Sequence, residues 1–255
     1  MDMSGKVVLV TGGSKGIGRG IAERFLSSGA RVFICGRNEP ESLPRSGEHE
    51  AVFLAADVRD AEQVDQLIGA IETQAGGLHV VVNNAGGAPY AEAATVSPRF
   101  SEKIIQLNLV GPLHVAQRAN QVMQSQDEGG VIINIASVSA TRPSPGTAAY
   151  GAAKAGLLSL TTSLAVEWAP KVRLNAVVAG LIRTEQAHLH YGDEAGIARV
   201  EETVPLGRMG TPDDVASACL FLASPMASYV SGSALTLHGG GERPAFLEAA
   251  SGEQG

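Results

Sequence analysis

The stretch KVVLVTGGSKGIGRGIAERFLSSG, residues 6–29, decides the fold of this chain. Its first six residues form a short valine-rich run, which predicts a strand buried on both faces, as in a parallel sheet. A glycine-rich turn follows, and RGIAERFLSSG then has the pattern of an amphipathic helix closed by Gly29. A strand, a glycine turn and a helix in this order can bind phosphate, because glycines allow close backbone approach and the helix start offers free N–H groups.

The glycines of this turn are Gly12, Gly16 and Gly18, which gives the spacing G-x-x-x-G-x-G. The more common spacing of dinucleotide-binding turns is G-x-G-x-x-G. A glycine-rich turn on its own is also consistent with a tight connection that binds nothing. Its position between a buried strand and a helix favours the binding of a nucleotide cofactor.

The alternation of strand and helix continues along the chain. Further strands are predicted in ARVFICGRN (30–38), AVFLAA (51–56), LHVVVNNAG (78–86), GGVIINIAS (129–137), RLNAVVAG (173–180) and ALTLHGGG (234–241). Helices are predicted at 60–74, 98–124, 150–168 and 211–224. This order predicts an α/β fold, a Rossmann-like doubly wound sheet of seven parallel strands with helices on both faces. We expect a single domain over residues 1–255, with a core at 6–240 and a loose tail at 241–255.

Three segments depart from this regular pattern. Residues 38–50 are polar and contain two prolines, so they predict a surface loop with at most one helical turn. The 98–124 helix contains Asn108 next to Gly111 and Pro112, which predicts a local kink with unpaired backbone groups. Residues 181–210 fit a substrate lid and a pair of short surface helices equally well.

Composition excludes several classes of function. The net charge of −7 argues against nucleic acid and anionic membranes as partners. The start MDMSGK lacks the apolar region of a signal peptide, and no apolar run approaches the roughly 18 residues that span a membrane. Cys35 and Cys219 lie in apolar runs, as in a reducing compartment. We therefore expect a cytoplasmic protein, and no metal site, because the six histidines lack ligand partners at metal spacing.

Residues 137–154, SVSATRPSPGTAAYGAAK, have the pattern of a proton-transfer site. Tyr150 and Lys154 lie one turn apart on one face of a predicted helix, and Ser137 ends a predicted strand. A phenol has a pKa of about 10, and a nearby ammonium group lowers it. Such a group suits the interconversion of an alcohol and a ketone when a cofactor carries the hydride. The alternative is an ordinary surface tyrosine and lysine, since Y-x-x-x-K alone is a weak motif.

The end of the second strand bears on the choice of cofactor. Many dinucleotide enzymes carry an acidic residue there for the ribose 2′-hydroxyl, but this chain has Gly36 followed by Arg37. A cation in place of an acid indicates a 2′-phosphate and hence NADP(H), and Lys15 in the glycine turn adds to this. The alternative is that Arg37 is a solvated loop residue, because Glu39 and Glu41 are nearby.

Several motifs occur together in the order and spacing of one family. They are TGGSKGIG (11–18), NNAG (83–86), Asn108, Ser137 and YGAAK (150–154). On these motifs the chain resembles the short-chain dehydrogenase/reductase family, in its compact single-domain branch, from Lys6 to Gly240. Residues 204–240 are also similar to the 3-oxoacyl-thioester reductases of that branch.

The resemblance implies a role for each catalytic residue. Tyr150 would be the general acid in reduction and the general base in oxidation. Lys154 would lower the pKa of that phenol and hold the nicotinamide ribose. Ser137 would orient and polarise the carbonyl group, and Asn108 would anchor a water molecule in a proton relay.

The resemblance also implies a cofactor-binding set. Asp57 and Val58 would contact the adenine, the residues from Asn84 to Gly86 would line the cleft, and Ile182 and Thr184 would meet the carboxamide and phosphates. The full set is Gly12, Ser14, Lys15, Gly16, Ile17, Gly18, Arg37, Asp57, Val58, Asn84, Ala85, Gly86, Tyr150, Lys154, Gly180, Ile182 and Thr184.

Two positions depart from the family pattern. Ala179 precedes Gly180 where proline is usual, which leaves a freer backbone at this turn. His238 stands before the last glycines, where an acidic or amide residue is common. The family further implies a homotetramer, and the 100–124 and 150–168 stretches carry apolar residues on more than one face, as helices buried on both sides do.

We therefore expect an oxidoreductase that transfers a hydride between NADP(H) and a ketone or secondary alcohol, with 3-oxoacyl thioesters among the candidate substrates. Alternatives are a steroid or small-alcohol dehydrogenase that uses NAD(H), and a catalytically silent nucleotide-sensing protein of the same fold. A sugar-nucleotide epimerase or dehydratase shares Y-x-x-x-K but usually has a longer C-terminal substrate region.

Overall fold

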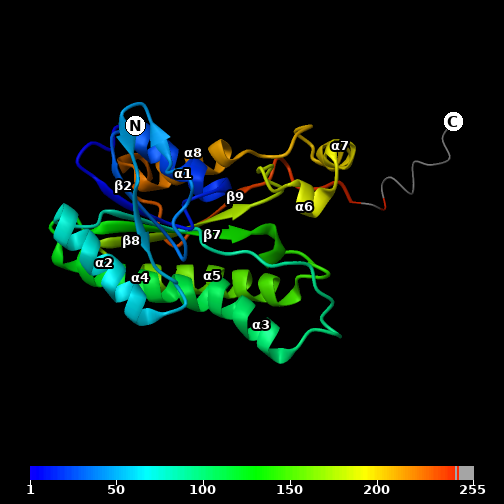
Figure 1. The fold of residues 1–255 in the computed structure, drawn as a ribbon, viewed down its shortest axis with the longest axis horizontal. Helices are drawn as coiled ribbons and strands as arrows, with labels where there is room; N and C mark the ends of the chain where they lie inside the picture. Colours follow the sequence, from blue (N-terminus) through cyan, green and yellow to red (C-terminus); the bar gives the residue numbers. More distant parts are fainter. Residues whose placement is uncertain (245, 247–255) are drawn as a thin grey trace.

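Seven parallel strands form the central sheet, in the order β5-β2-β1-β6-β7-β8-β9, in a computed structural model that describes residues 1–244 and 246 (Figure 1). In chain order they are β1 (Val7–Thr11), β2 (Arg31–Gly36), β5 (Val52–Ala55), β6 (Val80–Asn83), β7 (Gly130–Ser137), β8 (Val172–Ala179) and β9 (Ala234–Leu237). The predicted doubly wound, single-domain α/β fold is confirmed. The predicted loose tail at 241–255 falls mostly outside the described residues.

Helices cover both faces of this sheet, which explains why its central strands are apolar along their whole length. One face packs against α1 (Gly16–Ser27) and α8 (Pro212–Ala223). The other packs against α2 (Ala61–Ala75), α4 (Gly111–Ser125) and α5 (Ala148–Glu167), as Figure 1 shows. All five residues of β1 are buried as a result. Within the described part of the chain, no helix has the length and apolar character needed to cross a membrane.

Helix caps appear where the sequence indicates them. Asp60 caps α2 by accepting hydrogen bonds from the N–H groups of Glu62 and Gln63. Thr211 and Asp214 form a reciprocal capping box at the start of α8, where Pro212 occupies the first turn. Short 3-10 helices are η2 (Val138–Ala140) and η3 (Pro225–Ala227).

The long predicted helix at 98–124 is irregular at the expected place. It consists of α3 (Pro98–Ile105), the π-helical segment η1 (Gln106–Val110) and α4. The N–H of Gly111 donates to the carbonyl of Gln106, and the side-chain amide of Asn108 donates to the carbonyl of Ile104 at 2.9 Å. The irregularity is therefore one wide turn with these backbone groups bonded, whereas unpaired groups were expected.

The 38–50 segment differs from its prediction. Residues 45–50 form a small antiparallel hairpin of β3 (Arg45–Ser46) and β4 (His49–Glu50). Gly47 has a φ of +56° and makes the reversal possible, and an ion pair between Arg45 and Glu50 closes the hairpin. The expected plain loop is wrong for these residues, because a two-residue strand leaves no hydrophobic periodicity in the sequence.

The 181–210 region contains two short helices, α6 (His188–Tyr191) and α7 (Glu194–Thr203). Asp193 caps α7, and Ile197 is buried together with Ala187 and Met209 in a small apolar cluster. This agrees with the second of the two interpretations of the region.

The winding of the sheet creates a topological switch point between β1 and β6. From β1 the chain runs outward through β2 to β5, and it then returns to β6 on the other side of β1. Loops that leave the carboxyl ends of β1 and β6 therefore diverge. Ligands of open α/β sheets bind at such a switch point.

Candidate active site

The turn after β1 accepts only glycine at its critical positions. Gly12 and Gly16 have φ values of +63° and +54°, in the left-handed region that favours glycine. A Cβ atom added at Gly18 would lie 2.3 Å from the Gly12 carbonyl oxygen and 2.4 Å from Asn84 Nδ2. The turn therefore lies in direct contact with the loop after β6, and the start of α1 lies at the switch point of the sheet.

Hydrogen bonds fasten the end of β1 to the loop after β6. The Thr11 hydroxyl accepts from the N–H groups of Asn84 and Ala85, each at 3.0 Å. In return, Asn84 Nδ2 donates to the carbonyls of Thr11 and Gly12, at 3.0 and 3.1 Å. Asn84, predicted to line the cofactor cleft, fixes the geometry of the glycine turn.

The turn and the α1 N-terminus fit an anionic phosphate group. Within residues 1–244 and 246, the exposed N-cap residue Lys15 provides no side-chain cap, and the first turn of α1 contains no acidic residue. The N–H of Gly16 donates instead to the Glu185 carboxylate at 2.9 Å. The N–H group at this helix start therefore binds an oxyanion. The phosphates of a dinucleotide are oxyanions of the same kind.

The predicted adenosine-binding residues follow β2 and β5. Arg37 is exposed, and its charge contributes to the lowered pKa of Asp57, after the larger effect of a hydrogen bond from Arg59. A Cβ added at Gly36 would have its nearest neighbour at 3.8 Å, so that position has room for a side chain. Val58 is buried and packs against the start of α4.

Ser137, Tyr150 and Lys154 come together between β7 and α5, as their spacing predicts. Ser137 ends β7 and caps η2, and its hydroxyl accepts from the Ser139 N–H at 3.2 Å. Lys154 is 3% exposed, and its Nζ donates to the Ile135 carbonyl at 2.7 Å. The same Nζ lies 5.7 Å from the centroid of the Tyr150 ring.

The electrostatics of this group differ from the expectation. Burial raises the pKa of Tyr150, a hydrogen bond with Ser137 opposes that rise, and Tyr191 adds to it. Burial also lowers the pKa of Lys154 to about 8. The expected lowered pKa of Tyr150 is therefore wrong for this structure, because desolvation of the phenol outweighs its hydrogen bond with Ser137 and the Lys154 ammonium group donates to the Ile135 carbonyl.

Asn108 joins the π-helical segment to the same site. Its Oδ1 accepts from the Gly87 N–H at 2.8 Å, and its Nδ2 donates to the Gly87 carbonyl at 3.0 Å. A Cβ added at Gly86 would lie 2.6 Å from Asn108 Oδ1 and 3.3 Å from Lys154 Nζ. Gly86 thus allows the loop after β6 to approach both side chains.

The loop after β8 closes the site from the other side. Gly180 lies against His238. A Cβ atom added at Gly180 would be 2.7 Å from the Cβ atom of His238, so only glycine fits at this position. Ile182 forms a bridge with Gly210. Thr184 reaches the glycine turn, with its Cγ2 3.6 Å from a Cβ added at Gly16.

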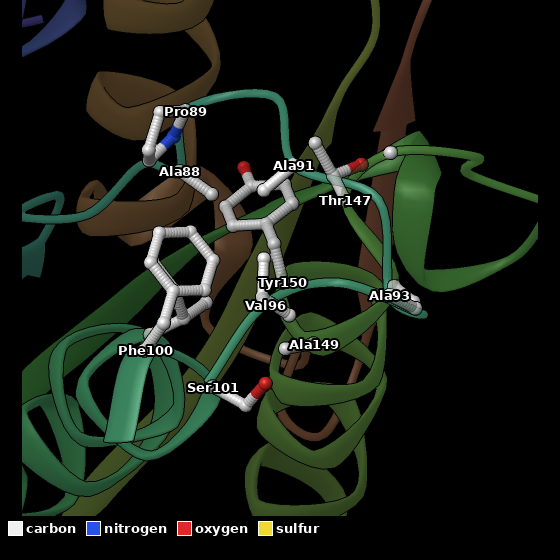
Figure 2. A pocket seen from close by; sticks show the side chains of 13 residues that line it. Ala88, Pro89, Ala91, Ala93, Val96, Phe100, Ser101, Thr147, Ala149 and Tyr150 are labelled. Carbon is white, nitrogen blue, oxygen red and sulfur yellow. The ribbon is translucent and has the colours of Figure 1, made fainter. Parts of the chain in front are cut away.

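An apolar pocket of about 110 Å³ opens beside Tyr150. Figure 2 shows the Tyr150 ring among the side chains of the loop after β6, the start of α3 and the start of α5. In the described chain, every lining residue is uncharged; they include Ala88, Pro89, Ala91, Val96, Phe100 and Ile104. A cavity of about 150 Å³ holds a benzene molecule, so this pocket suits a small apolar group.

Sequence reasoning missed two parts of the site. Phe100 and Ile104 line the pocket from α3, but the sequence indicates only an amphipathic helix there. Glu185 bonds to Gly16 across 169 residues of chain. No spacing rule connects residues so far apart; only the meeting of the loops that follow β1 and β8 does.

Comparisons with known proteins agree with this geometry. The model of the family described as Enoyl-(Acyl carrier protein) reductase matches residues 12–242. The chain is 38% identical to 3beta-hydroxysteroid dehydrogenase 1 of Eggerthella lenta, over 94% of both chains. It is 35% identical to 3-oxoacyl-[acyl-carrier-protein] reductase of Vibrio harveyi, over 94% of this chain and 98% of that one. A putative short-chain alcohol dehydrogenase from Sinorhizobium meliloti has a solved structure with a TM-score of 0.87 and 36% identity, covering 94% and 97% of the two chains.

Burial of Lys154 should lower the stability of the protein at neutral pH. A fall in pKa from 10.5 to about 8 corresponds to about 3 kcal/mol of unfolding free energy. This cost is complete below pH 8 and disappears by pH 10.5, because the unfolded state binds more protons between these values. Lys154→Met should therefore be about 1–3 kcal/mol more stable than wild type at pH 7, since the unpaired Ile135 carbonyl offsets part of the gain.

Urea unfolding at pH 7 and pH 10 measures this difference. The difference should shrink at pH 10, whereas the exposed control Lys103→Met should change little at either pH. A Lys154→Met protein that is less stable than wild type at both pH values would contradict the burial cost.

Proposed function

This chain belongs to the short-chain dehydrogenase/reductase family, whose members are NAD(P)-dependent oxidoreductases of alcohols and ketones, and we propose that it reduces ketones with a short apolar arm by a Ser-Tyr-Lys mechanism. The observation that carries the proposal is the position of Tyr150 at the apolar pocket, beside Ser137 and a buried Lys154. The cofactor supplies the hydride when bound; the protein's residues bind, orient and move protons.

Tyr150 is placed to act as the proton donor. A phenol is protonated at neutral pH, so Tyr150 can give its proton to a carbonyl oxygen as negative charge develops there. Ser137 hydrogen-bonds to this phenol and would also bond to the carbonyl oxygen. Lys154, with a pKa of about 8, is mostly protonated at pH 7 and stabilises the phenolate that remains. In oxidation, Tyr150 would accept the proton.

Further residues would hold the dinucleotide. We assign the phosphates to the turn from Gly12 to Gly18, including Ser14 and Ile17. The cleft next to the reacting ring is assigned to Asn84, Ala85, Gly86, Gly180, Ile182 and Thr184. Asp57 and Val58 would lie beside the adenine, and Asn108 would order a water molecule near Lys154.

The pocket favours acyl chains over sugars and steroids as substrates. Its uncharged walls offer few partners for the hydroxyl groups of a sugar, and unpaired polar groups bind poorly there. Its volume of about 110 Å³ suits a few carbon atoms rather than the four fused rings of a steroid. Short 3-oxoacyl thioesters combine an apolar arm with a ketone, which makes them our preferred substrate class. The Vibrio harveyi relative is named for such a substrate.

A carbonyl panel tests this function. We expect a higher kcat/KM for short 3-oxoacyl thioesters and methyl ketones than for aldohexoses or 3-ketosteroids, measured by NADPH oxidation. Tyr150→Phe should lose about 10²–10⁴-fold in kcat with unchanged cofactor affinity, because it removes the positioned acid. The fully exposed Tyr229→Phe serves as the control.

Retention of more than about a tenth of kcat in Tyr150→Phe, with chemistry rate-limiting, would show that another group is the acid. Equal activity on sugars and on acyl thioesters would show that the pocket does not select the substrate.

The cofactor should be NADP(H) in preference to NAD(H), although NAD(H) fits the same turn. Arg37 after β2 and Lys15 in the glycine turn are exposed, and Gly36 places no side chain next to Arg37. A bond from arginine to a charged oxygen contributes about 1.5–3 kcal/mol before screening, so a preference of about tenfold is expected. Arg37→Ala should weaken the preference, and Gly36→Asp should reverse it, because the carboxylate repels a 2′-phosphate.

Measuring kcat/KM for both cofactors at fixed ionic strength checks this preference, with the exposed Arg99→Ala as control. Equal kcat/KM values for the two cofactors in the wild type, or a preference that Arg37→Ala does not change, would show that Arg37 is a solvated loop residue.

We also propose a cytoplasmic homotetramer. Buried, unpaired Cys35 and Cys219 suit a reducing compartment. The exposed apolar residues Val166 and Met226 suit subunit contacts, and D₂ symmetry is common for tetramers. Light scattering at micromolar concentration should report four chains per particle; a monomer would contradict this assembly.

A further inference from the structure

Glu185 occupies the place that the proposed function assigns to a cofactor phosphate. Its Oε1 accepts a hydrogen bond of 2.9 Å from the N–H of Gly16, at the start of α1. Glu185 directly follows Thr184, whose side chain also lies against Gly16. The loop after β8 therefore brings a negative charge into the glycine turn.

A carboxylate and a phosphate compete for the same groups. Both are oxyanions that accept N–H donors at a helix start, where the dipole favours negative charge. One N–H cannot serve both at full strength, and two anions at this distance repel each other. The Glu185 carboxylate must therefore leave Gly16 before a pyrophosphate can bind in the turn.

The side chain of Glu185, and not its backbone, is free to make this movement. The Ala187 N–H donates to the Thr184 carbonyl at 3.0 Å, and the Gln186 N–H donates to the Thr184 hydroxyl at 3.3 Å. Ala187 is buried beside Ile197, which anchors this turn. Glu185 itself is exposed, so rotation of its side chain exchanges the bond to Gly16 for water.

We propose that Glu185 is a built-in competitor of the cofactor pyrophosphate that weakens the binding of NADP(H) and NAD(H) alike. This inference rests on the proposed function, because it takes the glycine turn as the phosphate site. A competitor attached to the protein reduces the fraction of molecules that can bind, and the apparent Kd rises by the same factor. Glu185 also slows association, since binding waits for its departure.

Two variants separate competition from simple charge repulsion. Glu185→Gln removes the charge, and Glu185→Asp keeps it but shortens the side chain by one methylene group, so that it no longer reaches Gly16. We expect both variants to bind NADPH and NADH about three- to tenfold more tightly than wild type, a range set by the exposure of the contact. The control Glu48→Gln removes the same charge from the exposed 45–50 hairpin.

Calorimetry and stopped-flow fluorescence on the protein without substrate provide the readouts. Association should be faster in both variants, with dissociation nearly unchanged, because the competing contact exists only in the free protein. Adenosine 2′-monophosphate, which lacks the pyrophosphate, should bind all variants equally. In steady state the KM for the cofactor should fall while kcat does not rise.

Three results would overturn the inference. Unchanged or weaker dinucleotide binding in Glu185→Gln would make the contact a neutral or supporting surface bond. Tighter binding in Glu185→Gln but not in Glu185→Asp, with a change in dissociation alone, would indicate repulsion in the complex. These outcomes leave the proposed function intact, whereas failure of the wild type and both variants to bind either dinucleotide would overturn both.

Discussion

The close contact between the glycine turn and the loop after β6 is the constraint on which the site depends. Gly18 leaves no room for a side chain beside Asn84, so the ends of β1 and β6 are held at a fixed separation. Two residues further along, Gly86 touches both Asn108 and Lys154. A side chain at Gly18 would push Asn84 away from the turn, and one at Gly86 would collide with Asn108 and approach Lys154, so the glycine turn and the surroundings of Lys154 share one framework.

Burial of the site disfavours the charged forms of its own titratable groups. Lys154 has lost most of its contact with water and keeps one carbonyl partner, and Tyr150 is held in its neutral form by the same burial. A preorganised acid and a nearby cation are what carbonyl reduction needs, because no solvent has to rearrange as charge develops. The free energy for this arrangement comes from the apolar clusters on the two faces of the sheet.

Sequence patterns predict the regular parts of this protein and the residues of its centre. The seven strands can be recognised in the sequence because burial on both faces makes them apolar throughout. The four-residue spacing of Tyr150 and Lys154 places these two residues on one helix face. The strands of the 45–50 hairpin are too short to produce a hydrophobic period in the sequence. The pKa of Tyr150 and the bond between Glu185 and Gly16 depend on how distant segments pack, which local patterns do not encode.

The π-helical turn between α3 and α4 has a consequence for how such a pocket diversifies. Each residue in a helix advances the side-chain direction by about 100°. The extra residue in this wide turn sets the angular offset between the face of α4 that packs on the sheet and the face of α3 that presents Phe100 to the pocket. Loss or gain of one residue in η1 would turn α3, and with it Phe100 and the pocket wall, relative to α4 and the sheet. Because η1 also carries Asn108, the same change would move the bonds of Asn108 to Gly87, so the pocket wall and the loop after β6 would shift together.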